Sequence, residues 1–224
     1  MSSRRRSISC VADECIVTID LRALLSIESY TKPVLIFNPY AGKLRRHPDI
    51  LQRTIDILSK AGCRVEPRPT DGPNRGGAMA SSAIRGGADL VVALGGDGTI
   101  NEIAQGMVGS RVPLAFLPGG TANVLCCETG IGTNLPRAAH RLIQCVEERV
   151  SVGRFEPQQG DPRYFLAMAG VGLDAAIVEK VSLPLKKATG KFAYWVGGFQ
   201  QAFARLEPFR AAQNGSGASY GFAL

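Results

Sequence analysis

DLVVALGGDGT, residues 89–99, is the stretch of sequence that decides the fold. From Asp89 to Leu94 it forms an apolar run of the kind found in strands that are buried on both faces of a parallel sheet. The glycines that follow form a tight turn, and we expect a helix to begin near Thr99 or Ile100. A buried strand that leads at once into a helix is the repeating unit of α/β proteins.

The same alternation of strands and helices continues on both sides of this unit. Short apolar runs closed by Asn, Pro or Gly predict strands, and apolar residues at helical spacing predict helices, one of them closed by Gly62. The order of these segments predicts an open, Rossmann-like parallel α/β sheet in three layers. The expected strands are 34–37, 63–70, 89–94 and 113–117, and the expected helices are 47–61, 74–85 and 135–148.

Three loops have an unusual composition, and each follows one of these strands. They come after Phe37, Leu94 and Leu117, and the last of them is a second glycine–threonine turn, PGGT at 118–121. In open parallel sheets, ligands bind beyond the carboxyl ends of the strands. All three loops are therefore expected at the edge of the sheet where a ligand would bind.

The pattern changes after about residue 150. Segments 150–155 and 163–168 are predicted as strands with no helix between them, which is typical of an antiparallel arrangement. An aromatic stripe at 192–203 predicts an amphipathic helix that packs on a sheet, in preference to a lipid-docking surface. The chain ends in a strand-like segment, so we expect a fragment. The expected domains are an N-terminal extension (1–31), a first domain (32–149) and the truncated start of a β-rich domain, an incomplete β-sandwich (150–224).

Composition limits the classes of protein that fit. The 224 residues have a net charge of +7, which suits an anionic partner without selecting one. Six cysteines without a C-x-x-C pair, together with two histidines, argue against a zinc site and favour reduced thiols in the cytoplasm. We find no secretory signal and no apolar stretch of about 18 residues, so any membrane contact is expected to be peripheral.

The turn GGDGT at 95–99 has the features of a phosphate site. Glycines after a buried strand let successive N–H groups converge on an anion, and the helix that follows adds its positive N-terminal end. Asp97 would repel phosphate unless it met a cation or a hydroxyl, so it is the candidate catalytic acid, either organising a Mg²⁺-bound water or accepting a proton. The alternative is an ordinary turn with Thr99 as the helix N-cap. The second glycine–threonine turn, one strand later, favours the functional interpretation, although the common nucleotide motifs G-x-x-x-x-G-K-[ST] and G-x-G-x-x-G are absent.

Three segments, in order and in spacing, resemble the successive signatures of the diacylglycerol kinase catalytic domain family. They are VLIFNPYAGK (34–43), GGDGTINEIAQGM (95–107) and PLAFLPGGTANVL (113–125). The family includes bacterial soluble lipid kinases and is similar to sphingosine and ceramide kinases, and more remotely to NAD kinase and 6-phosphofructokinase. The resemblance covers roughly residues 32–210. It implies an ATP-binding domain at 32–149 that uses Mg²⁺ to phosphorylate the hydroxyl of diacylglycerol or a similar lipid alcohol.

The resemblance also implies a role for individual residues. The N-P-x-x-G turn and the end of the second strand would face the nucleotide, the first glycine turn would wrap its phosphates, and the second would close the opposite wall. An Asx-turn at Asn38 and a strand cap at Thr70 are the structural alternatives, and Glu102 is either polar at the site or a favourable charge at a helix start. The implied nucleotide-binding residues are Asn38, Gly42, Thr70, Gly95, Gly96, Asp97, Gly98, Thr99, Ile100, Asn101, Gly120, Thr121 and Asn123.

The sequence departs from the family in two respects. Val124 stands where many relatives have Asp, and members run about a third longer, through a segment that supplies the structural Mg²⁺ site and a proposed general base. Metal ligands therefore stay unassigned. The implied partners are ATP and a lipid at a membrane surface, without nucleic acid, and a homodimer is left open. The alternatives are a nucleotide-binding fragment without activity and a kinase for a sphingoid base or NAD.

Three basic residues follow the first special loop. Lys43, Arg45 and Arg46 are interpreted either as a cluster that helps to hold phosphates or anionic headgroups, or as an exposed solvated cluster. The sequence does not separate these two interpretations.

Overall fold

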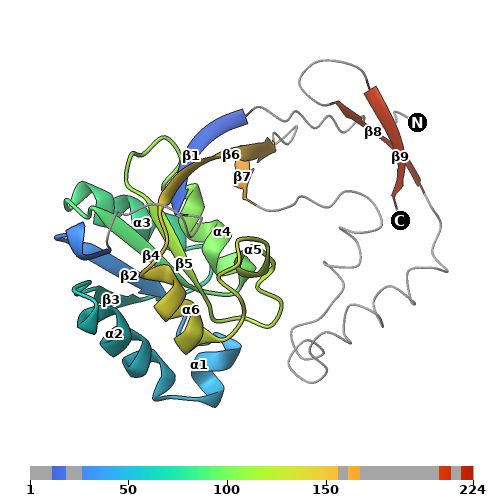
Figure 1. Cartoon of the computed structure of the whole chain (residues 1–224). Helices are drawn as coiled ribbons and strands as arrows, with labels where there is room; N and C mark the ends of the chain where they lie inside the picture. The colour runs from blue at the N-terminus through green and yellow to red at the C-terminus, as the bar shows by residue number, and fades with distance from the viewer. Residues whose placement is uncertain (1–11, 19–26, 156–160, 167–206, 213–217, 224) are drawn as a thin grey trace. The chain divides into compact units, whose positions relative to one another are not determined.

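The computed structural model describes residues 12–18, 27–155, 161–166, 207–212 and 218–223 (Figure 1). The chain divides into two compact units, one formed by residues 13–152 and the other by the segments 1–12 and 153–224. All three special loops lie in the first unit.

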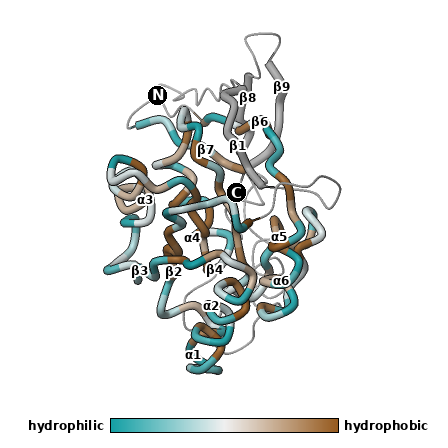
Figure 2. Tube along the Cα trace, turned by 60° about the vertical axis from the view of Figure 1, so that its left-hand side comes forward, coloured by the Kyte–Doolittle hydropathy of each residue, from teal (hydrophilic) through white to brown (hydrophobic). Residues whose placement is uncertain are grey.

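The centre of the first unit is a parallel sheet, as the sequence predicts. Its strands β2 (Pro33–Phe37), β3 (Glu66–Pro69), β4 (Leu90–Gly95) and β5 (Leu114–Pro118) lie in the order β3-β2-β4-β5. Every residue of β2, β4 and β5 is buried, which explains why these strands read as unbroken apolar runs. Figure 2 shows the corresponding hydrophobic stretches in β2 and β4. The α/β class is therefore confirmed.

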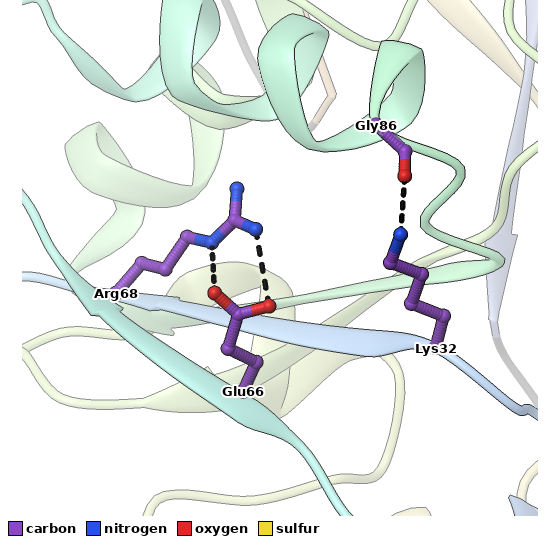
Figure 3. A network of polar contacts seen from close by, with 4 residues as sticks. All are labelled: Lys32, Glu66, Arg68 and Gly86. Carbon is purple, nitrogen blue, oxygen red and sulfur yellow. Dashed lines mark hydrogen bonds and ion pairs between the residues drawn. The ribbon is translucent and has the colours of Figure 1, made fainter.

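Strand β3 lies at the edge of this sheet and is mostly exposed. Its two prolines are tolerated because an edge strand has one side without a partner. Glu66 and Arg68 form a two-pronged ion pair on it, with N–O distances of 2.8 and 3.1 Å (Figure 3). The strand begins at Glu66, later than the predicted Cys63, because Cys63 N–H bonds to Leu58 O and closes the preceding helix.

Helices cover both faces of the sheet. The chain runs from β2 through α1 (Gly42–Arg46) and α2 (Ile50–Lys60) outward to β3, and then through α3 (Gly76–Arg85) back across β2 to β4. Because such crossovers are right-handed, these two connections place α2 and α3 on opposite faces. Accordingly, α3 packs against α4 (Asp97–Gln105), and α2 packs against α6 (Leu135–Leu142) (Figure 1).

Hydrogen bonds hold the amino ends of β2 and β4 together. The Asp89 carboxylate accepts bonds from the Thr31 N–H, the Thr31 hydroxyl and the Lys32 N–H at 2.5, 2.8 and 2.9 Å. Burial disfavours the Asp89 carboxylate, but these bonds outweigh it and hold its pKa below the ordinary value. The Lys32 ammonium also bonds to the carbonyl of Gly86 at the end of α3 (Figure 3), which satisfies a C-terminal helix carbonyl.

Several boundaries differ from the sequence prediction. Helix α4 begins at Asp97 and not near Thr99. Helix α6 ends at Leu142 and cannot reach the predicted residue 148, because β6 (Glu147–Phe155) begins before that residue. No element was predicted before residue 32, yet β1 (Ala12–Thr18) pairs with β5 in parallel, and η1 (Ile27–Ser29) follows it. A strand can depend on its pairing partner more than on its own pattern, so its sequence alone did not reveal it.

The second unit is described only in part. Residues 153–155 of β6 pair antiparallel with β7 (Arg163–Phe165), and β8 (Glu207–Ala212) pairs antiparallel with β9 (Ala218–Ala223). The predicted amphipathic helix at 192–203 lies outside the described residues. The domain boundaries and the β-sandwich architecture stay predictions. Among the described helices, none is long and apolar enough to cross a lipid bilayer.

Candidate functional site

The topology of the sheet selects one crevice. The chain leaves β2 toward β3 on one side, whereas it leaves β4 toward β5 on the other side. The carboxyl ends of these two neighbouring strands therefore form a topological switch point, which is where open α/β sheets bind ligands. The loop after Phe37 and the turn after Leu94 meet at this point: Asn38 N–H donates to Leu94 O at 3.0 Å.

The first glycine turn joins β4 directly to α4. Gly96 is the extended N-cap residue, with φ −85° and ψ 175°, and its carbonyl accepts the Ile100 N–H at 3.1 Å. Thr99 is therefore the third residue of the helix, so its predicted role as the N-cap is wrong. The first N–H groups of a helix have no partner within the helix itself. The first N–H groups of α4 lie at the carboxyl edge of the sheet and contribute to the positive end of the helix.

Gly98 differs from the other glycines of this turn. It is exposed, it has an ordinary helical backbone, and a Cβ atom built on it would meet nothing within 4 Å. A Cβ on Gly95, in contrast, would lie 2.5 Å from the Cβ of Thr99. The fold therefore explains the glycine at 95, but no part of the described chain explains the glycine at 98.

The second glycine turn lies directly against the first. Gly119 N–H and Gly120 N–H both donate to Gly95 O, at 2.6 and 3.1 Å. A Cβ on Gly119 would lie 2.9 Å from the Cα of Gly95, and one on Gly120 would lie 2.5 Å from the Cα of Gly96. The two turns therefore pack backbone against backbone, which only glycine permits. Gly119 has a part in this packing that the predicted site residues did not include.

Asn123 holds the second turn in shape. It is fully buried and adopts a left-handed backbone, with φ 51° and ψ 52°, which Asn tolerates better than most residues. Its side-chain oxygen accepts the Gly120 N–H and its amide donates to Gly120 O, both at 2.9 Å. Both polar ends of the side chain are thus occupied within the turn, while Thr121 at its tip is exposed.

Asp97 connects the first glycine turn to α5, the helix that follows the second turn. Its Oδ1 accepts the N–H of Leu125 at 3.3 Å, in the first turn of α5 (Val124–Glu128). A carboxylate at this position stabilises a helix start. Beneath it, burial and then the neighbouring Asp97 raise the pKa of the Cys126 thiol to about 12. Cys126 is therefore an inert, protonated part of the support.

The loop after β2 forms the other side of the crevice. Asn38 Oδ1 accepts the Tyr40 N–H at 2.8 Å, so the Asx-turn foreseen as an alternative is present. The Asn38 amide nevertheless also reaches Thr99 Oγ1 in the first turn of α4, at 3.4 Å. Thr70 follows β3, and its N–H donates to Phe37 O at 2.8 Å. Gly42 begins α1.

The predicted residues thus fall into two groups, those that direct bonds and contacts join to one another and those that are not joined in this way. Direct bonds and contacts join most of them at the carboxyl edge of β2, β4 and β5. Ile100 is buried, and Asn101 lies beyond it on α4. The joined residues are Asn38, Gly95, Gly96, Thr99, Gly120 and Asn123, together with Asp97, which follows Gly96 in the chain and bonds to Leu125. No grouping of three or more His, Cys, Asp or Glu side chains suited to a metal occurs among the residues that the structure describes.

Comparisons with known proteins give a consistent result. Residues 32–155 match the family model of the diacylglycerol kinase catalytic domain. An uncharacterised protein from Synechocystis is 31% identical over 177 residues, which are 75% of this chain and 40% of that protein. A diacylglycerol kinase from Staphylococcus saprophyticus is 29% identical over 171 residues, 74% of this chain and 53% of that enzyme.

A solved structure is also similar. It is that of a diacylglycerol kinase from Bacillus anthracis, with a TM-score of 0.45 and 29% identity over 52% of this chain and 42% of that chain. The chain spans about half the length of the curated relatives that it matches.

Proposed function

The chain belongs to the diacylglycerol kinase catalytic domain family, and from this premise we propose that it binds ATP with Mg²⁺ at the crevice between β2 and β4. We propose further that it contributes this site to a lipid kinase, which transfers the γ-phosphoryl group to a hydroxyl of diacylglycerol or a similar lipid alcohol. Contact with the membrane that holds the lipid would be peripheral, from the cytoplasm.

One observation carries the proposal, and it is the unexplained glycine at 98. Glycine within a helix costs about 0.5–1 kcal/mol relative to alanine. Gly98, the second residue of α4, bears part of this cost although a Cβ there would be in open space. A ligand that comes close to the start of α4 accounts for the glycine, because a side chain at 98 would occupy the space of the ligand. The position suits a phosphate chain, since helix N-termini bind anions.

The residues around Gly98 fit a triphosphate. The first N–H groups of α4, which have no partner within the helix, would bind phosphate oxygens. The Asn38 amide, held near Thr99, would orient the nucleotide from the opposite side. The second turn would form the far wall, kept in place by Asn123. These groups are fixed before the ligand arrives, and positioning by prearranged groups is the main contribution to phosphoryl transfer.

The reaction would be an in-line displacement. The lipid hydroxyl oxygen forms a bond to the γ-phosphorus, the bond to the β–γ bridging oxygen breaks, and ADP leaves with that oxygen. Mg²⁺, when bound, neutralises charge on the phosphates. One Asp97 oxygen is bonded to Leu125 N–H; we propose that the other faces the hydroxyl or a metal-bound water. We do not assign the final proton acceptor to a residue of this chain; the resemblance implies a general base in the additional segment of the longer relatives.

Binding by the 224-residue chain tests the nucleotide site. We expect saturable binding of ATP with Mg²⁺ by calorimetry, and Gly98→Ala should weaken it roughly tenfold or more, because one methyl group would displace a phosphate contact. Its melting temperature should not fall. The matched control is Gly86→Ala, at the far end of the sheet, which should keep the affinity. A Gly98→Ala variant with wild-type affinity contradicts the site.

Labelled ATP then tests the reaction. Phosphorylation of diacylglycerol by the chain supports the full proposal, whereas transfer to a sphingoid base or to NAD alone assigns another acceptor. ATP binding with no transfer to any acceptor indicates a nucleotide-binding fragment whose catalytic carboxylate lies elsewhere.

A further inference from the structure

We infer that Lys43 is a positioning residue, whose ammonium group fastens the second glycine turn to the start of α1 and so holds one wall of the nucleotide site in place. This inference rests on the proposed function, because it assigns to that site a residue that acts through its loops and not through the ligand. It also resolves the two interpretations of the basic cluster at 43–46, since Lys43 separates from Arg45 and Arg46.

The contacts of Lys43 reach two segments outside α1. Its Nζ donates to Pro118 O at 3.0 Å and also to Thr133 O, and its main-chain N–H donates to Gly119 O at 3.1 Å. Pro118 ends β5, Gly119 begins the second glycine turn, and Thr133 lies just before the N-cap of α6, Asn134. One residue in the first turn of α1 therefore bonds to the segments on both sides of α5.

These bonds act on the same peptide groups that join the two glycine turns. The Gly119 carbonyl receives the Lys43 N–H, while the Gly119 and Gly120 N–H groups donate to Gly95 O. The position of the second turn relative to Gly95 and Gly96 is thus fixed from two sides. If the ammonium were removed, Pro118 O and Thr133 O would lose a charged donor, and the turn would be held by its main-chain bonds and by the Asn123 side chain.

The surroundings of Lys43 match this role better than that of an exposed cation. The side chain is half-buried, and this burial lowers the pKa of its ammonium group. No ion pair joins it to a carboxylate in the part of the chain that the structure describes. Arg45 and Arg46 are exposed, and the Arg46 guanidinium folds back onto Gly42 O. A partly desolvated ammonium bound to two carbonyls fixes the segments to which those carbonyls belong.

Amide hydrogen exchange of the nucleotide-free chain, compared with its ATP affinity, tests the inference. In Lys43→Met, which keeps the aliphatic stem, we expect exchange at the Gly119 and Gly120 amides to be at least roughly tenfold faster. Exchange at the central β4 amides should be unchanged, and ATP with Mg²⁺ should bind roughly tenfold more weakly. The matched control is Arg45→Met, which removes the same charge from the same helix and should change neither quantity.

Each other outcome is informative. Weaker ATP binding with unchanged exchange would mean that Lys43 contacts the phosphates directly, which overturns the inference. Unchanged exchange with unchanged affinity overturns it as well. If wild type binds no nucleotide, the proposed function fails, but faster exchange in Lys43→Met would still support the role of Lys43 in the loops. Should Lys43→Met fail to fold, Lys43→Gln, which keeps a shorter donor, is compared in the same way.

Discussion

At the scale of single residues, the glycines of the site are explained by different physical requirements. Gly95, Gly119 and Gly120 are required by the chain itself, because added Cβ atoms would enter neighbouring backbone or side chain. Gly98 has no such requirement. The sequence motif treats all of these glycines alike, and only their surroundings separate the structural ones from the one that we assign to the ligand.

Asp97 has two roles to separate, and a pair of substitutions does so. Asp97→Ala removes both the charge and the bond to Leu125 N–H, so we expect loss of phosphoryl transfer and a loss of stability of about 1 kcal/mol. Asp97→Asn keeps an oxygen that can accept this bond, and should lose transfer while it keeps most of the stability. Phosphoryl transfer from labelled ATP and urea unfolding measure the two effects. Wild-type turnover in Asp97→Asn would remove the carboxylate from the mechanism.

At the scale of secondary-structure elements, the placement of α4 depends on its contact with α3. Gly77 and Gly106 bring the two helices so close that a Cβ on Gly106 would lie 1.9 Å from Gly77 O. Ser81 Oγ adds a bond to Gly106 O at 2.9 Å. This contact fixes the axis of α4 and, with it, the direction in which the N–H groups at its start point.

The same substitution at the two ends of α4 should therefore have opposite effects. Gly106→Ala forces the helices apart, and we expect it to lower the free energy of unfolding by about 1–3 kcal/mol. Gly98→Ala meets open space and improves helix propensity, so it should raise the free energy of unfolding by up to about 1 kcal/mol. Denaturant unfolding of both variants checks this. Equal destabilisation by both would show that the chain itself needs the glycine at 98.

At the scale of the whole molecule, several buried groups make stability depend on alkaline pH. Burial raises the pKa of Cys63 to about 11 and that of Cys126 to about 12. Burial and then the bond to Glu147 also raise the pKa of Tyr30. The folded chain keeps these protons at a pH where the unfolded chain loses them, so their contribution to stability falls as pH rises. Lys43 has the opposite sign, because its pKa is lowered.

As pH rises, three of these groups lower the stability of the fold and Lys43 alone raises it. We therefore predict a net loss of stability above about pH 9. The free energy of unfolding, measured in urea from pH 8 to 11, should fall by at most about 1.4 kcal/mol per pH unit for each group. The half-exposed Tyr30 should contribute less than the thiols. Cys63→Ala should make the slope shallower, whereas Cys127→Ala, which removes an exposed thiol, should not. An unchanged slope in Cys63→Ala would contradict the assignment.

A feature of the fold or of the site could be predicted when it depends on residues that lie close together in the sequence. The strand–turn–helix unit at 89–99, the parallel sheet and the edge position of the three loops were predicted, because a buried apolar run and the glycines after it lie within a few residues. The predicted boundaries were wrong where distant partners decide them. Helix α6 cannot reach residue 148 because β6 begins at Glu147, and β1 is a strand only through its place beside β5.

By itself, then, the sequence determined the α/β class, the order of the elements and the edge of the sheet where a phosphate site could form. The tertiary structure decided which groups meet there. Asp97 bonds to a residue 28 positions away, and Lys43 bonds to one 90 positions away. Such contacts exist only after the chain has folded, since the sheet register and the packing of the two glycine turns bring the partners together, and no local pattern in the sequence encodes them.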